Sequence, residues 1–270
     1  MRIARQMLVL VICNSSICHA AIVLDFNLPS PGTINDVNGL GTGFTTRLLG
    51  TGSAIASNDP NMNLLTNPGR LSLTSTHSNL GGLALPSDNH SIAEAPGFFV
   101  SGVGTKDIQI VGGFRNIHVL HGSDQISVYA AIDATKTLRA AVHELNAFVL
   151  SVNDGSGDVN LVSPLGIFST GDDIDIMLSR QAGSWIMSWH NLTNSTNGSL
   201  SAVSVPWLDA QPNLYFGIHA ANAGSSQSFV AEFDSFSLNF VPEPTAMLVC
   251  AGILASAAFL FGRRSRFLIS

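Results

Sequence analysis

Asp173-Ile-Asp-Ile-Met-Leu-Ser-Arg-Gln-Ala-Gly-Ser-Trp-Ile-Met-Ser-Trp189 is the stretch that decides the fold of this 270-residue chain. Apolar residues alternate with polar ones along both halves of it: Ile174, Ile176 and Leu178 in the first half, and Trp185, Met187 and Trp189 in the second. Such alternation is typical of strands that bury one face. A short loop containing Gly183 joins the halves, so the stretch predicts an antiparallel β-hairpin.

Further strand signals recur about every ten to twelve residues and have no amphipathic helix between them. We expect strands at Ile22–Phe26, Leu71–Ser75, Phe98–Val103, Asp107–His118, Ile126–Ala131, Thr137–Val142, Ala147–Val152, Leu200–Val205, Leu214–His219 and Phe229–Phe240. Residues 28–67 are rich in Gly, Asn and Pro, which indicates an ordered loop region with one or two strands. The pattern predicts an all-β, antiparallel β-sandwich over residues 21–240.

The hairpin, the later Ser204-Val-Pro-Trp-Leu208 and the closing Ala231-Glu-Phe-Asp-Ser-Phe-Ser-Leu238 together resemble a known family. They are similar to the concanavalin A-like (laminin G-like) jelly roll, and the likeness in pattern covers most of Ile22–Phe240. The resemblance implies a fold that both glycan-binding and glycan-cleaving proteins use.

The N-terminus, residues 1–20, has the pattern of a secretory signal peptide. Basic Arg2 and Arg5 precede the short apolar run Met7–Cys13, and cleavage is expected after Ala20. The apolar run is too short to span a membrane.

The C-terminal tail, residues 241–270, opens with Pro242, Glu243 and Pro244 and then runs without charge from Thr245 to Gly262. Eighteen helical residues rise roughly 27 Å, close to the thickness of a bilayer core, so 245–262 is an expected transmembrane helix. Arg263, Arg264 and Arg266 follow it. Basic residues stay on the cytoplasmic side, which would place residues 21–241 outside.

This order of Pro-Glu-Pro, apolar span and arginine cluster resembles the PEP-CTERM sorting tail of exported bacterial proteins. The resemblance implies export, a membrane-anchored stage, and cleavage near Pro-Glu-Pro by an exosortase-type protease. It also implies a producer of extracellular polysaccharide, and a final location at the cell envelope or the extracellular surface. The alternative is an ordinary single-pass anchor.

Composition narrows the class of partner. The stretch from Ala21 to Val241 holds 7 basic and 17 acidic residues, and therefore a net charge of −10. This excludes the basic footprint that nucleic acid requires. The three cysteines, Cys13, Cys18 and Cys250, all lie in the terminal segments, so the sandwich must be stabilised by its core without disulfides.

One strand has part of a catalytic pattern. The β-glucanases of the concanavalin A-like family carry Glu-x-Asp-x-x-Glu, with the outer glutamates as nucleophile and acid/base. Here Glu232 and Asp234 match, but Ser237 stands at the position of the second Glu. The sequence therefore predicts no catalytic pair on this strand and a non-enzymatic protein.

Cofactor signals are weak. The run Asn153–Asp158 has oxygen side chains and glycines at the density of a calcium loop, with Asp154 and Asp158 as candidate ligands. A polar hairpin turn explains the same residues, and Asp172, Asp173 and Asp175 form a second acidic group of the same kind. His118 and His121, three apart on a strand, point to opposite faces and make a poor metal grip. No cofactor is therefore expected, with calcium as the open alternative.

Three tryptophans are present: Trp185, Trp189 and Trp207. Trp185 and Trp189 share a face with Met187 and are expected in the core. Trp207 is the candidate for stacking on a sugar ring.

Three functional hypotheses remain. The first is an exported surface or matrix protein that binds or structures extracellular polysaccharide. The second is a polysaccharide hydrolase whose carboxylates come from separate strands. The third is a structural matrix component with no specific ligand.

Overall fold

The computed structural model describes residues 21–31, 33–48, 58–75, 95–118, 125–133, 135–143, 146–221 and 229–240. Ala21 to Asn239 belong to one compact unit. The expected signal peptide, with Ala20 at its end, and the expected tail at 241–270 lie outside the described residues. Within the described ranges, no helix has the length and apolar character needed to cross a bilayer.

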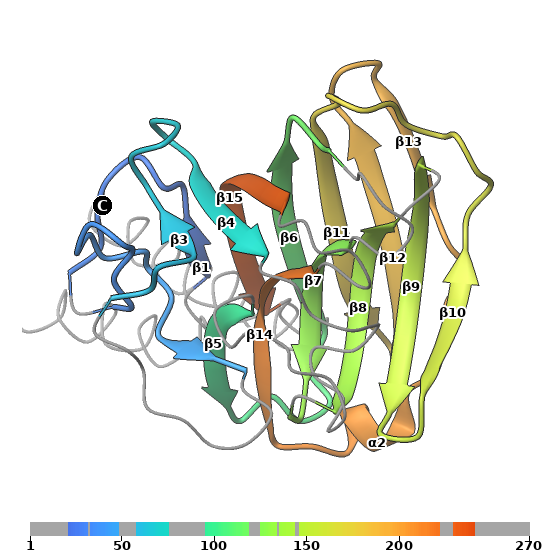
Figure 1. Ribbon diagram of the computed structural model, residues 1–270. Helices are drawn as coiled ribbons and strands as arrows, with labels where there is room; N and C mark the ends of the chain where they lie inside the picture. Colours follow the sequence, from blue (N-terminus) through green and yellow to red (C-terminus); the bar gives the residue numbers. More distant parts are fainter. Residues whose placement is uncertain are drawn as a thin grey trace, which may run out of the picture. The chain divides into compact units, whose positions relative to one another are not determined.

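The described chain is all-β and forms two sheets whose named strands pair antiparallel, as a β-sandwich requires (Figure 1). The eight-stranded sheet has the order β13-β12-β11-β6-β15-β4-β3, and β1 also pairs with β15. Its strands are β1 (Ile22–Leu24), β3 (Met62–Asn63), β4 (Leu71–Ser75), β6 (Ile108–Arg115), β11 (Ile174–Gln181), β12 (Ser184–Asn191), β13 (Thr196–Ser199) and β15 (Phe229–Phe240).

The seven-stranded sheet has the order β10-β9-β8-β7-β14-β5-β2. Its strands are β2 (Thr46–Arg47), β5 (Pro96–Ser101), β7 (Gln125–Ala131), β8 (Lys136–His143), β9 (Ala147–Asp154), β10 (Asp158–Val162) and β14 (Asn213–Ala221). The four-residue helix α2 (Pro206–Asp209) precedes β14.

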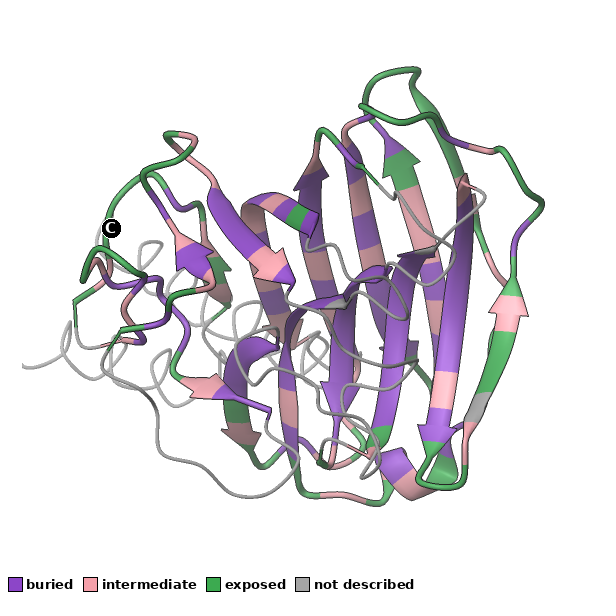
Figure 2. Cartoon of the chain, viewed as in Figure 1, coloured by how far each residue is buried: buried purple, intermediate pink, exposed green. Residues whose placement is uncertain are grey.

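The predicted hairpin is confirmed. Ile176 pairs with Trp189 and Leu178 with Met187 across β11 and β12. Ile174, Ile176 and Leu178 have no exposed surface, because their side chains point into the layer between the sheets. Figure 2 shows the resulting alternation of buried and less buried residues along these strands.

A buried arginine closes one end of this core. Arg180 is fully buried and donates to the Lys106 and Gly104 carbonyl oxygens and to Asp209 Oδ1, at 3.2 Å. Trp185 Nε1 donates to the same Asp209 oxygen at 2.9 Å, and the guanidinium lies 5.3 Å from the Trp185 ring centre. A buried charge is tolerated only with such partners, so Asp209 fixes α2 against the hairpin.

Two local expectations were wrong. Leu200–Val205 does not form a strand; Val203 makes only an isolated bridge to Trp185, because Pro206 starts α2 directly afterwards. Conversely, Asp158–Val162 and Thr196–Ser199 form the edge strands β10 and β13. Both are short and flank polar turns, so neither shows a strand-like alternation long enough to read.

Candidate functional site

The candidate site is the outer face of the seven-stranded sheet, and the register of the strands shows which side chains lie on that face. Odd-numbered residues of β8 and β9 and of β7 face away from the core, since their neighbours Leu138, Leu150 and Val128 are buried in it. Directly opposite residues form one lateral row across the sheet: Asn160, Ser151, Arg139, Tyr129, Gly217, Gly97 and Thr46. We call this the central row.

Arg139 is the polar centre of the central row. Its Nη1 donates to Gln125 Oε1 at 2.7 Å, and its Nη2 donates to Ser151 Oγ at 2.9 Å. Ser127 Oγ and His219 Nδ1, in the adjacent row, lie 3.3 Å apart because the two residues are direct cross-strand neighbours. This half of the face offers hydrogen-bonding groups from four strands.

The side chain of Tyr129 on β7 reaches past Gly217 of β14 to Gly97 of β5. Its hydroxyl donates to the Ala95 carbonyl oxygen at 3.1 Å. A Cβ added to Gly97 or Gly217 would lie 2.5 or 2.8 Å from this hydroxyl oxygen, so both glycines make room for the ring. Burial raises the pKa of the Tyr129 phenol above its ordinary value of 10.0, and the phenol stays a neutral donor.

An aromatic pair follows at the β5 side of the same face. Phe99 and Tyr215 are cross-strand partners with ring centres 4.9 Å apart. Phe99 is 47% exposed and Tyr215 is half-buried, whereas Arg139, Tyr129, Ser151 and His219 are at most 1% exposed. Of these residues the aromatic pair is accessible, and the polar ones beside it on the same face are buried.

The opposite sheet holds the carboxylates of the incomplete catalytic pattern. Glu232 accepts from Arg70 Nη1 at 2.6 Å and from Asn67. Asp234 is ion-paired with Arg115, which also binds Asp175 at 3.0 Å. Each carboxylate thus has an arginine partner.

Gly113 makes the Arg115 cluster possible. A Cβ at this position would lie 2.2 Å from Asp234 Oδ1 and 2.9 Å from Arg115 Nη2. The cluster of Asp175, Arg115 and Asp234 spans β11, β6 and β15 on the outer face of the eight-stranded sheet. Asp175 therefore has a structural partner that its sequence position does not reveal.

The calcium candidates lie at the turn between β9 and β10. Asp154 Oδ1 accepts from the Ser156 amide at 2.9 Å and from Ser156 Oγ at 2.5 Å, as in a polar hairpin turn. These bonds lower the pKa of the exposed Asp154 carboxyl below its ordinary value of 3.8. Among the residues that the structure describes, no three His, Cys, Asp or Glu side chains come together as a metal site. A calcium role for Asp154 and Asp158 stays a prediction.

The second acidic group is spread over separate local contacts. Asp172 is buried and accepts from Asn191 and from the Ser169 amide. Asp173 accepts from the Asn116 amide at 2.9 Å, and Asp175 binds Arg115. His118 is exposed, and His121 lies outside the described residues.

The tryptophans occupy different environments. Trp185 is fully buried, and Trp189 stacks on Phe148 with ring centres 4.4 Å apart, both inside the sandwich. Trp207 is half-buried on α2. Its role in sugar stacking stays a prediction. The expected sorting residues Pro242, Glu243, Pro244, Arg263, Arg264 and Arg266 lie outside the described residues.

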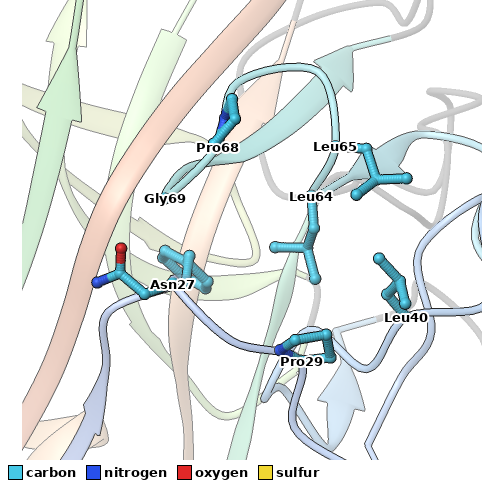
Figure 3. Close-up of a pocket in the computed structure, with 8 residues that line it drawn as sticks. Asn27, Pro29, Leu40, Leu64, Leu65, Pro68 and Gly69 are labelled. Carbon is cyan, nitrogen blue, oxygen red and sulfur yellow. The ribbon is translucent and has the colours of Figure 1, made fainter.

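A small apolar pocket of about 170 Å³ lies between the loops before β4. Figure 3 shows Leu40, Leu64 and Leu65 directed toward the space, with Pro29 and Asn27 at its side. It carries no titratable side chain and supports no chemistry of its own.

Comparison with known proteins adds the fold alone. No protein-family model and no curated protein matches the sequence. Solved structures with a similar fold include the GH43 protein BlXynB from Bacillus licheniformis, with a TM-score of 0.56 and 12% identity over 82% of this chain and 39% of that one. Another is xylan β-1,4-xylosidase from Bacillus halodurans C-125, with a TM-score of 0.54 and 11% identity over 81% of this chain and 39% of that one.

A third similar structure is the xyloglucan PUL protein GH43B of Bacteroides ovatus, with a TM-score of 0.52 and 12% identity over 83% of this chain and 40% of that one. The chain thus spans about two fifths of each of these larger proteins. The two sheets of this chain match the fold of one part of each larger protein. At these identities no residue role is carried over to this chain.

Proposed function

We propose that residues 21–240 form a concanavalin A-like (laminin G-like) jelly roll that binds extracellular polysaccharide without cleaving it. The observation that carries the proposal is the exposed Phe99–Tyr215 pair on the outer face of the seven-stranded sheet. Pyranose rings have apolar faces that pack on aromatic side chains, and a half-exposed aromatic pair supplies such a platform.

The surroundings of the pair suit a neutral ligand. The row of the pair continues through Ala131, Thr137 and Asn153, which are buried, to Asp158 at the β10 edge. The exposed neighbours of the pair on the same face are Ser101 and Asn213, which are neutral and carry hydroxyl and amide groups of the kinds that hydrogen-bond sugar hydroxyls. The similar solved structures include a xylan β-1,4-xylosidase and a xyloglucan-locus protein, which is compatible with a polysaccharide ligand.

The carboxylates argue for binding rather than hydrolysis. A retaining glycosidase needs two carboxyl groups about 5–5.5 Å apart, and an inverting one needs about 6.5–9.5 Å. Glu232 and Asp234 lie on the other sheet, and each is held by an arginine. The described rows of the proposed binding face contain one acidic residue, Asp158 at the β10 edge, and a glycosidase needs two.

The terminal segments supply delivery in this proposal. The signal peptide directs export, and the Pro242-Glu243-Pro244 tail with its span at 245–262 holds the protein in the membrane until an exosortase-type protease cuts it. The sandwich then acts at the cell envelope or in the extracellular matrix.

Binding to immobilised xylan, xyloglucan and bacterial extracellular polysaccharides, with Phe99→Ala compared with the wild type, tests the proposal. A bound sugar that covers the exposed half of the Phe99 side chain gains about 1 kcal/mol of binding free energy. We therefore expect about fivefold weaker binding for Phe99→Ala. Val230→Ala is the matched control, since Val230 is also 47% exposed but lies on the other sheet.

Equal losses for Phe99→Ala and Val230→Ala would refute the binding face. Release of reducing sugars from any of these polymers would favour the hydrolase hypothesis instead. No binding by the wild type to any polymer would favour a structural matrix component.

A further inference from the structure

Strand β10 is an open edge of the seven-stranded sheet. Among the strands that the structure describes it pairs with β9 alone, in continuous register from Asp158↔Asn153 to Val162↔Val149. Val159 is 69% exposed and Val162 is 55% exposed, and Leu165 just beyond the strand is 62% exposed. The run from Val159 to Phe168 contains no charged residue.

The other described sheet edges differ from it. Strand β13 is polar, with the sequence Thr-Asn-Gly-Ser, β2 and β3 have two residues each, and β1, which exposes Val23, has three. Short length, charge, proline and bulges are the usual protections of a sheet edge. β10 is five residues long, carries its one charge at its first residue, Asp158, exposes the apolar side chains of Val159 and Val162, and has no bulge in its register.

The backbone of β10 offers a regular set of outward hydrogen-bonding groups. The Ser163 amide donates to the Phe148 carbonyl oxygen at 2.9 Å, so odd-numbered residues direct their backbone groups toward β9. Alternate residues of an antiparallel strand point to opposite sides. Asp158, Asn160 and Val162 therefore direct N–H and C=O away from the sheet.

We propose that β10 is a self-association edge, at which a second copy of this chain adds its own β10 in antiparallel orientation about a two-fold axis at Asn160. This register places Val159 beside the partner's Leu161 on the same face, and Asp158 beside the partner's Val162. Cross-strand apolar pairs stabilise a sheet, while no like charges meet. The result is one continuous sheet across both copies, with the same patch used twice.

A second copy suits this edge because the strand is self-complementary, with its charged residue Asp158 beside an uncharged Val162 of the other copy. Two copies with a net charge of −10 each over Ala21–Val241 repel one another over most of their surface. The uncharged run from Val159 to Phe168 is a place where they can approach. The proposal does not depend on carbohydrate binding.

Sedimentation velocity of the full chain in detergent gives the first test. The wild type is expected at twice the protein mass, and Val159→Lys at the single mass, because a charge at an open edge blocks strand addition. Asn197→Lys on β13 is the matched control and should stay dimeric. Association through the apolar tail would affect all three proteins alike.

A wild type that stays monomeric, or a dimer that Val159→Lys leaves intact while Asn197→Lys dissociates it, would overturn the proposal. So would a dimer that neither substitution changes.

Disulfide capture tests the register. In a chain with Cys13, Cys18 and Cys250 replaced by Ser, Asn160→Cys places two thiols at an antiparallel pair about 5.5 Å apart between Cα atoms, within disulfide range. We expect a band of doubled mass on a non-reducing gel. Asn197→Cys should give little of it, and equal capture at both positions would contradict the β10 register.

Discussion

Ile176→Asp tests the face assignment of the central hairpin. Ile176 is fully buried, lies between Gly112 of β6 and Trp189 of β12 in register, and faces the other sheet. Removing most of its side chain costs about 2–5 kcal/mol, as for other buried large-to-small changes. An unpaired carboxylate in this apolar layer adds several kcal/mol, roughly.

The sum is comparable to the whole stability of a domain, which is about 5–15 kcal/mol. We therefore expect Ile176→Asp to be unfolded, and Ile176→Val to lose only about 0.5–1.5 kcal/mol. Asp175→Ser is the neighbouring control. Its carboxylate is one-third exposed, and Arg115 keeps Asp234, so the loss should stay below about 1 kcal/mol.

Urea unfolding followed by tryptophan fluorescence is the assay, because Trp185 and Trp189 lie on the partner strand. Ile176→Asp should be unfolded without urea, whereas Ile176→Val and Asp175→Ser should both unfold at urea concentrations close to that of the wild type. Equal unfolding midpoints for Ile176→Asp and Asp175→Ser would refute the assignment of Ile176 to the buried face.

Three further predictions concern packing, pH and sorting. Gly217→Ala should lose about 1–3 kcal/mol in urea unfolding, because its Cβ would lie 2.1 Å from the Pro96 carbonyl oxygen, a backbone atom that cannot yield; unchanged stability would contradict this contact. Asp154→Ala should lower the melting temperature at neutral pH but not in strong acid. The lowered pKa of Asp154 gives stability above pH 3.8 that is lost as the pH falls through that lowered pKa, so an equal deficit at both pH values would contradict it. Replacing Pro242, Glu243 and Pro244 together by Ala should leave the chain uncut in the inner membrane of a host with the matching exosortase, as shown by mass spectrometry of the C-terminus; an intact Ser270 on the surface-located native protein would leave a plain anchor.

The hairpin could be predicted because its information is local. Ile174, Ile176 and Leu178 define a face within eight residues, and the Gly183 turn fixes their partner strand. The two-sheet class followed in the same way from repeated alternation. The ion pair of Asp175 could not be predicted, because its partner Arg115 is sixty residues away in the sequence and on another strand.

The proposed binding face could be predicted from the sequence less well than the hairpin. The alternation of Thr137 and Arg139 with Leu138 and Ala140 signals a polar outer face on one strand. The residues that lie beside this strand depend on the order of the strands in the sheet, because Tyr129 of β7 pairs with Arg139 of β8 on one side and with Gly217 of β14 on the other. Phe98 and Phe99 are adjacent in the sequence, and only the packing of Phe98 against Phe236 shows which one faces outward.

The two sheets divide the charges of this domain unequally, and this division bears on how it can bind. The described ion pairs of Arg70, Arg115 and Arg180 belong to strands or loops of the eight-stranded sheet or to contacts at its end, whereas Arg47 on β2 of the seven-stranded sheet forms a buried pair with Asp59. On the three rows of the seven-stranded face, the charged residues are Arg139, which is buried, and Asp158 at the β10 edge. A ligand that meets Phe99 and Tyr215 therefore encounters aromatic surface and the exposed neutral side chains of Ser101 and Asn213, which contribute through burial and hydrogen bonding and are little affected by salt. Recognition of this kind suits a neutral polymer with many weak, repeated contacts, and a paired sheet formed through β10 would present two such faces to one chain of it.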